Sequence, residues 1–211
     1  MGRLLMVNGS PRGPRSNSKE YGNLFASYFP GEVDTYLVTQ RNHTQVVQNL
    51  RSYSDILLVF PLYADGLPVT LMEFLKVMQE HPPEEKPTIH LLINCGFLEP
   101  EQNEVASEMV QLFCQQNGYA FGSMLWIGSG EAILTTPFRS RAVKKIQALA
   151  RGIANGRPVQ LKTTMPLPKW LFLRASRSYW VGYGERFHTT PQEMATMAIE
   201  GMEPSQEKRE P

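Results

Sequence analysis

The chain has 211 residues and an almost balanced charge, with 21 lysines and arginines against 20 aspartates and glutamates. This length suffices for one sizeable α/β domain with residues left over, and the net charge of +1 gives no reason to expect binding to nucleic acid or attraction to a membrane. No apolar run reaches the ~18 residues of a membrane-spanning helix and the first residues lack the apolar core of a signal peptide, so we expect a cytoplasmic protein without a transmembrane segment.

Short apolar runs alternate with longer amphipathic stretches along most of the chain. Five runs are typical of β-strands: Leu4–Asn8, Val33–Val38, Asp55–Phe60, Thr88–Asn94 and Tyr119–Ile127. The stretches that follow them are typical of helices: 18–29, 43–53, 68–80, 100–117 and 137–154. The third run is apolar on both faces, as a buried parallel strand is, whereas Asp34 and Thr35 indicate an edge position for the second. Repeated β-α units predict a doubly wound parallel sheet with helices on both faces.

The alternation ends at Pro158. We therefore divide the chain into a sheet domain, residues 1–157, and a C-terminal extension, residues 158–211. The last part of the extension, 203–211, is polar and is expected to be frayed.

The extension combines aromatic residues, among them Trp170 and Trp180, with an excess of cations. Because such a composition is typical of an interface, we predict a helical extension that packs on the domain or completes a dimer. A membrane-surface helix over Lys169–Trp180 is the alternative. We rank it lower because Gly182 and Gly184 are expected to cut the helix short.

A loop rich in hydroxyls and arginine, Gly9–Ser18, follows the first predicted strand. The backbone N–H groups at the start of the next helix have no partner within the helix, and the helix dipole favours an anion there. Side-chain donors add to them: Ser10, Ser16, Asn17 and Ser18, with Arg12 or Arg15 as a forked cation. The pattern predicts a phosphate site. The alternative is a polar loop in which Ser16 or Asn17 merely caps the helix.

Three further loops are expected at the same edge, because ligands of open α/β sheets bind beyond the carboxyl ends of the strands. They are Phe60–Pro68, Asn94–Leu98 and Gly128–Glu131. Their small residues let the backbone approach a flat ligand closely. The first of the three could instead be only a turn that starts a helix. The last begins like a dinucleotide motif but has Ile133 where a third glycine belongs, and no Gly-Lys-Ser/Thr phosphate loop occurs.

The cysteines and histidines give no metal motif. Cys95 and Cys114 form no C-x-x-C pair, and the four histidines have no spacing typical of metal ligands. We expect no metal site and two reduced thiols. Cys95 follows the fourth predicted strand, and we interpret it as a buried inert thiol rather than a redox group.

Three segments, in this order, resemble those of the flavodoxin-like NAD(P)H-dependent FMN reductases and quinone reductases. They are Gly9-Ser10-Pro11-Arg12 with Ser16-Asn17-Ser18, then Pro61-Leu62-Tyr63-Ala64 followed by Leu67-Pro68, then Asn94-Cys95-Gly96-Phe97. The resemblance covers residues 1–155. It implies a flavodoxin-like, five-stranded parallel sheet with strand order 2-1-3-4-5.

The resemblance also implies bound FMN, with a role for each segment. The phosphate would be held by Ser10, Arg12, Ser16, Asn17 and Ser18. The ribityl chain and one ring edge would be lined by Pro61, Leu62, Tyr63 and Ala64, and the pyrimidine side of the ring would meet Asn94, Gly96 and Phe97. The insert Gly13-Pro14-Arg15 departs from the family pattern and leaves open which arginine reaches the phosphate.

The implied reaction is hydride transfer from NAD(P)H, as co-substrate, to the flavin and on to a quinone, a free flavin or a similar small acceptor. The flavin carries this chemistry, so no catalytic acid or base is required and none is assigned. We expect a homo-oligomer, most simply a homodimer. Two alternatives stay open: an electron carrier without nicotinamide activity, and an interaction protein that keeps the fold without a cofactor. Electron-carrying flavodoxins are typically acidic and this chain is not, which favours an enzyme.

Overall fold

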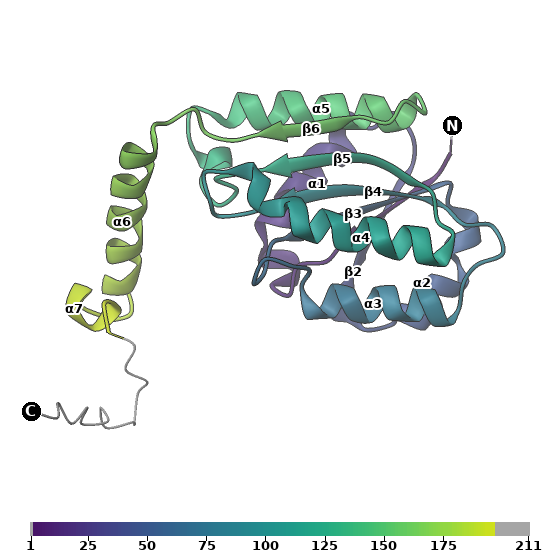
Figure 1. Cartoon of the computed structure of the whole chain (residues 1–211), viewed down its shortest axis with the longest axis horizontal. Coiled ribbons are helices and arrows are strands. Elements are labelled where there is room, and N and C mark those ends of the chain that lie inside the picture. Colours follow the sequence, from purple (N-terminus) through teal and green to yellow (C-terminus); the bar gives the residue numbers. More distant parts are fainter. Residues whose placement is uncertain (1, 197–211) are drawn as a thin grey trace, which may run out of the picture. The chain divides into compact units, whose positions relative to one another are not determined.

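The computed structural model describes residues 2–196, which form two compact units, the first ending at Pro166 and the second beginning at Leu167. The expectation of a frayed stretch at 203–211 lies outside the described residues. The first unit is a parallel sheet in the order β2-β1-β3-β4-β5-β6 (Figure 1). Its strands are β1 (Leu4–Asn8), β2 (Val33–Leu37), β3 (Asp55–Pro61), β4 (Thr88–Asn94), β5 (Phe121–Ile127) and β6 (Gln160–Thr163).

Helices cover both faces of the sheet. They are α1 (Asn17–Tyr28), α2 (His43–Gln48), α3 (Val69–Glu80), α4 (Glu104–Asn117) and α5 (Arg139–Ala154). On one face Leu5, Val7 and Ile56 join the main core with residues of α2, α3 and α4. Residues of the opposite parity, such as Leu4 and Leu57, are also fully buried. The helices α1 and α5, which contact each other, cover this other face of the sheet (Figure 1). Burial on both faces explains why the central strands read as continuous apolar runs.

The predicted flavodoxin-like fold and the order 2-1-3-4-5 of the first five strands are confirmed, and β2 is an edge strand as expected. The predicted count of five strands is wrong. The sixth strand, β6, pairs in parallel with β5 from Met124↔Gln160 to Ile127↔Thr163. Residues 158–166 therefore belong to the sheet unit, whereas the sequence-based boundary at 157/158 assigned them to a helical extension. The strand is short and alternates polar with apolar residues, so it gave no strong apolar run.

The second unit holds α6 (Lys169–Glu185) and the single-turn α7 (Pro191–Met194). The helical extension is thus confirmed from Lys169 onward, but the predicted interruption at Gly182 and Gly184 is wrong, because α6 continues through both. At Gly184 an added Cβ would lie 2.6 Å from the Met194 sulfur. This glycine therefore serves close packing of α7 on α6 rather than a chain break. By contrast, Gly118 and Gly156 have the positive φ of helix-ending residues.

Candidate functional site

The carboxyl ends of β1, β3, β4 and β5 lie side by side, and backbone hydrogen bonds continue the sheet into their loops. Gly9 N–H donates to Val59 O (2.9 Å), Leu62 N–H to Asn94 O (2.8 Å) and Cys95 N–H to Ile127 O (2.9 Å). The structure thus brings the four predicted loops to one edge of the sheet. Their backbones are positioned by the strands, so side chains from distant parts of the sequence meet there.

Asn8, which the sequence reasoning left out, organises the first loop. Its side-chain oxygen accepts from Ser10 N (3.0 Å), and its amide nitrogen donates to Ser16 Oγ (3.3 Å). Gly13 closes the loop with φ +53°, a conformation that favours glycine. The Asn8 side chain is buried, so these bonds are made away from water. An asparagine directly after a buried strand was the available signal.

Ser16 caps α1, as in the alternative interpretation of this loop, in which Ser16 or Asn17 caps the helix. Its hydroxyl oxygen accepts from Lys19 N (3.2 Å), while its hydrogen is donated to Gly13 O (2.7 Å). Ser10 Oγ accepts from Arg12 N (3.3 Å), and the Ser10 side chain is buried. Arg12 and Arg15 are both exposed at this loop.

Ser18 and Asn94, predicted at opposite ends of the cofactor, bind each other. The Asn94 amide nitrogen donates to Ser18 Oγ (3.0 Å) and to Phe60 O (3.1 Å), and both side chains are buried. This amide joins α1, β3 and β4. The donors of Asn94 therefore stabilise the edge itself, and its backbone rather than its amide nitrogen faces the neighbouring loop.

The second loop makes a tight turn over Tyr63–Gly66. Tyr63 N–H donates to Gly66 O (3.1 Å) and Gly66 N–H to Tyr63 O (2.9 Å), and the two central residues have positive φ, 45° for Ala64 and 57° for Asp65. Neither is a glycine, so the turn holds strained backbone. Pro61 and Leu62 precede it, half-buried, and the Tyr63 ring is exposed.

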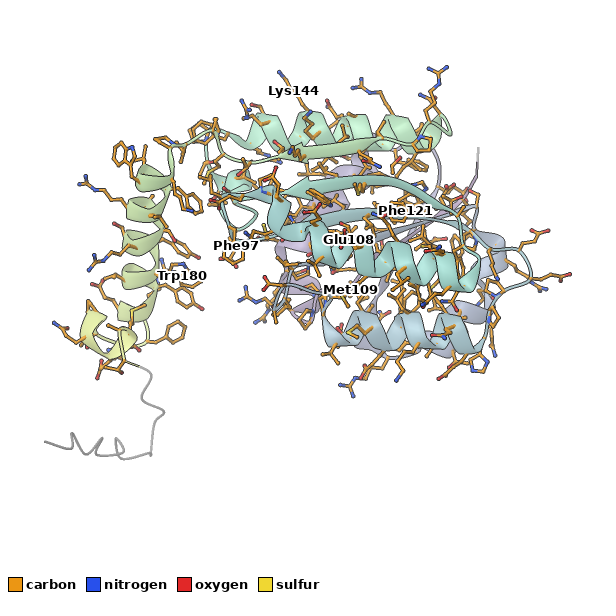
Figure 2. All side chains as sticks on the ribbon, in the orientation of Figure 1. Phe97, Glu108, Met109, Phe121, Lys144 and Trp180 are labelled. Atoms are coloured by element: carbon orange, nitrogen blue, oxygen red, sulfur yellow. The ribbon has the colours of Figure 1, made fainter. Side chains whose placement is uncertain are left out.

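The third loop presents Gly96 and Phe97. A Cβ added at Gly96 would meet no atom within 4 Å, so the backbone there borders open space. The Phe97 ring is exposed and lies near the end of the sheet (Figure 2). Cys95 is buried, and burial raises the pKa of its thiol despite hydrogen bonds with Phe97 and Asn103 that lower it. The interpretation of Cys95 as an inert thiol agrees with this environment.

The fourth loop is held by groups that the sequence reasoning missed. Tyr21 on α1 donates from its phenol to Gly130 O (2.8 Å), and Thr164, just after β6, donates to Leu98 O (2.6 Å) and contacts Ser129 Oγ (3.0 Å). Burial, with smaller contributions from Cys95 and Glu131, raises the pKa of Tyr21, so the phenol stays protonated and donating. These are long-range contacts, for which no local pattern in the sequence is a signal.

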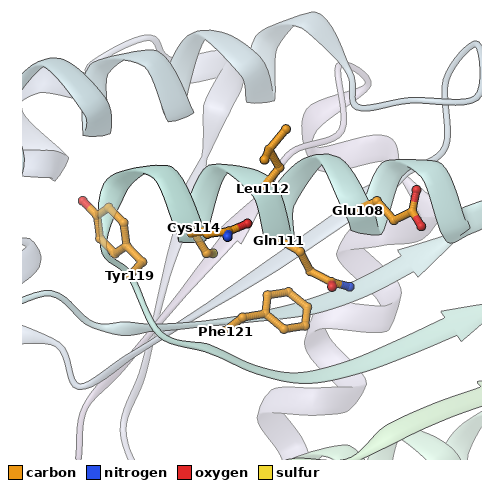
Figure 3. A pocket seen from close by; sticks show the side chains of 7 residues that line it. Glu108, Gln111, Leu112, Cys114, Tyr119 and Phe121 are labelled. Carbon is orange, nitrogen blue, oxygen red and sulfur yellow. The ribbon is translucent and has the colours of Figure 1, made fainter.

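Two hollows lie away from this edge. One of about 460 Å³ lies beside α4 and β5 (Figure 3), and one of about 330 Å³ is lined by residues of β1, β2 and α2. We place the candidate site at the strand ends nevertheless. Open α/β sheets bind ligands there, and the four predicted loops meet at that edge.

The residues at the edge fit a flat, phosphate-bearing cofactor. The first loop has hydroxyl and backbone donors, two exposed arginines and no carboxylate between Gly9 and Ser18. The second and third loops offer exposed aromatic rings, Tyr63 and Phe97, and open space beside Gly96. Among residues 2–196, no group of three or more His, Cys, Asp or Glu side chains could hold a metal ion. None of the helices in that range has the length and apolarity to cross a membrane.

Comparison with known proteins supports the fold. No protein-family profile and no curated protein matches the sequence. Solved structures do match the fold. An NAD(P)H:quinone oxidoreductase from Methanothermobacter marburgensis is 11% identical over 72% of this chain and 96% of its own (TM-score 0.57). An FMN-dependent NADH-azoreductase from Bacillus anthracis, solved with FMN, is 10% identical over 72% of this chain and 100% of its own (TM-score 0.54). A flavodoxin from Streptococcus pneumonia is 14% identical over 72% of this chain and 99% of its own (TM-score 0.53). At these identities the similarity establishes the flavodoxin-like fold alone.

Proposed function

We propose that this protein is an FMN-dependent NAD(P)H oxidoreductase that passes a hydride to a quinone, a free flavin or a similar small acceptor. The observation that carries the proposal is the meeting, at one sheet edge, of a basic hydroxyl-rich loop with two loops that carry exposed aromatic rings. An NAD(P)H:quinone oxidoreductase and an FMN-dependent NADH-azoreductase are among the solved structures with this fold. We further propose that it works in the cytoplasm as a homo-oligomer.

In this proposal each loop has its own task. The start of α1, Ser10 Oγ and an arginine, Arg12 or Arg15, hold the phosphate. Asn8 and Ser16 keep that loop in shape. Tyr63 and Phe97 exclude water from the faces of the ring, and the backbone at Gly96 approaches the ring edge. Bound FMN would supply the hydride chemistry, and the protein positions it.

The test is the absorbance of the purified protein near the flavin bands, before and after addition of FMN. We expect a bound flavin whose spectrum differs from that of free FMN. Anaerobic mixing with NADH and with NADPH then bleaches the flavin with at least one of them. A protein that never binds FMN contradicts the proposal, and a bound flavin that stays oxidised with both nicotinamides supports the electron-carrier alternative.

Substitutions in the first loop test the proposed position of the FMN phosphate. Ser10→Asp places a carboxylate where the phosphate is proposed, and we expect it to weaken FMN binding at least ~100-fold. Ser27→Asp, at an exposed position of α1, is the matched control and keeps the wild-type affinity. Arg12→Ala and Arg15→Ala, measured separately by titration with FMN, show which arginine contacts the phosphate. Equal affinity of Ser10→Asp and wild type would contradict the placement.

A further inference from the structure

One face of α6 carries a stripe of large apolar side chains. At 100° per residue, Leu173, Tyr179, Trp180 and Tyr183 fall on one side of the helix axis. Phe187, in the turn that follows the helix, extends the stripe through its contact with Tyr183. All five are exposed, Phe187 by 64%. The rings of the stripe contact one another, with centroids 5.8 Å apart for Trp180 and Tyr183 and 5.1 Å for Tyr183 and Phe187. The stripe is therefore a contiguous exposed apolar surface, of the kind that marks an interaction site.

The stripe is bordered by positive charge. Arg177 flanks it by helical position, Arg186 caps the end of α6 beside Phe187, and Arg174 lies on the opposite side of α6. The surrounding sequence is one-sided in charge, because Ala132–Gly184 holds ten lysines and arginines and no aspartate or glutamate. A surface that combines apolar side chains with carboxylates would therefore complement the stripe.

α4 presents such a surface. Val105, Met109 and Leu112, spaced as i, i+4 and i+7, are exposed on one side of the helix. Glu104 and Glu108 are exposed beside them, and α4 contains no lysine or arginine. Figure 2 shows Glu108 and Met109 on this helix. We call these five residues the α4 surface.

A hollow adjoins the α4 surface. It measures about 460 Å³ and is lined by residues that include Glu108, Leu112, Tyr119 and Phe121 (Figure 3). Its lining combines apolar and aromatic side chains with two amides, Gln111 and Gln115, and a carboxylate, Glu108. A tryptophan or tyrosine ring with a neighbouring arginine suits this combination of shape and charge.

We infer that the partner is a second copy of this chain, in which the stripe of each copy packs on the α4 surface of the other. The two helices have similar lengths, about 25 Å for the 17 residues of α6 and about 21 Å for the 14 of α4. Two such reciprocal contacts make a closed, two-fold symmetric dimer. The inference does not depend on flavin binding.

A short connection leads from the sheet unit to α6. Met165 is buried, and only Pro166-Leu167-Pro168 separates it from the first residue of α6. Two prolines in three residues make this connection stiff.

Charge-swap variants test the pairing. One protein carries Arg177→Glu and Arg186→Glu, and the other carries Glu104→Arg and Glu108→Arg. Each alone places like charges against each other and is expected to weaken dimerisation at least ~100-fold. An equimolar mixture restores both contacts. The acidic α6 of the first variant packs on the basic α4 of the second, and the wild-type α6 of the second packs on the wild-type α4 of the first. Light scattering after size exclusion therefore reports monomers for each variant and a dimer of twice the 23.9 kDa chain mass for the mixture.

Arg174→Glu is the matched control, since it makes the same charge change on the opposite side of α6, and it stays dimeric. Circular dichroism verifies that every variant is folded. Three outcomes would overturn the inference: a wild type that is monomeric, swaps that leave the dimer unchanged, or a mixture that stays monomeric although the wild type dimerises. A monomeric wild type that binds vesicles containing anionic lipid would assign α6 to a membrane instead.

Discussion

At the scale of single residues, Asn94 shows how a polar side chain in the candidate site can serve the fold. Its amide nitrogen donates to Ser18 Oγ and Phe60 O, and the side chain is buried. Buried donors without a partner, or acceptors facing acceptors, are costly. The edge of the sheet at which we propose the flavin therefore depends on an amide that joins α1, β3 and β4 in the absence of a ligand.

We expect Asn94→Asp to lower the free energy of unfolding by about 2–3 kcal/mol, because a carboxylate would face the Phe60 carbonyl oxygen in a buried place. Asn49→Asp is the control. It also removes an amide that donates to a backbone carbonyl, Gln45 O, but on the surface, and it is expected to cost less than ~1 kcal/mol. Urea unfolding followed by circular dichroism measures both. Equal losses would show that the position of Asn94 is not special.

The Asp55–His90 pair predicts a dependence of stability on pH. Asp55 Oδ1 accepts from His90 Nε2 (2.9 Å) and Oδ2 from Ser54 Oγ (2.6 Å). Burial raises the pKa of Asp55, but these hydrogen bonds lower it by more, so the folded pKa lies below the usual value. As the pH falls, the unfolded chain takes up the proton first. The stability that this group contributes is thus complete above the unfolded pKa of about 3.9 and is lost as the pH falls through the folded pKa.

Asp55→Asn removes this titration and keeps an oxygen for His90. We expect the variant to lose less stability than the wild type between about pH 5 and pH 3. Urea midpoints at several pH values measure the difference. Parallel pH curves for the two proteins would contradict the expectation.

At the scale of elements, the Tyr63–Gly66 turn holds non-glycine residues in a conformation that glycine adopts more readily. Ala64 has φ 45°. We expect Ala64→Gly to stabilise the protein by about 0.5–1 kcal/mol. The control, Ala148→Gly within α5, is expected to destabilise it by about 1 kcal/mol. The same substitution would thus act with opposite signs in thermal or urea unfolding, and a loss at both positions would rule out strain in the turn.

The elements also show what the sequence could predict. β1 and β4 have the predicted bounds, because buried parallel strands are continuous apolar runs. β6 could not be found in this way, since Gln160 and Lys162 alternate with Leu161 in a strand of four residues whose pairing is settled by β5. In the site, the loops and their shared edge followed from topology. The contacts of Tyr21, Asn94 and Thr164 did not, because they join residues far apart in the chain.

At the scale of the whole molecule, the boundary between the two units follows β6. The sheet unit ends at Pro166, with Thr163 and Met165 buried in it. We expect a chain that stops after Pro166 to be at least ~2 kcal/mol more stable than one that stops after Arg157, because the shorter chain loses β6 and the burial of Met165. Urea unfolding of the two truncated proteins measures the difference. Equal urea midpoints would show that the sheet unit ends at Arg157, as the sequence predicted.

β6 also matters for aggregation. It covers β5, a run of seven mostly apolar residues, Phe-Gly-Ser-Met-Leu-Trp-Ile, whose unpaired backbone could recruit strands from other molecules. β6 itself is a poor template for further growth, being four residues long, with a charged Lys162 on its exposed side and Pro166 soon after its end. During synthesis the β5 edge stays open until residues 160–163 have left the ribosome. The last strand of the sheet thus closes the interval in which a nascent chain is most prone to self-association.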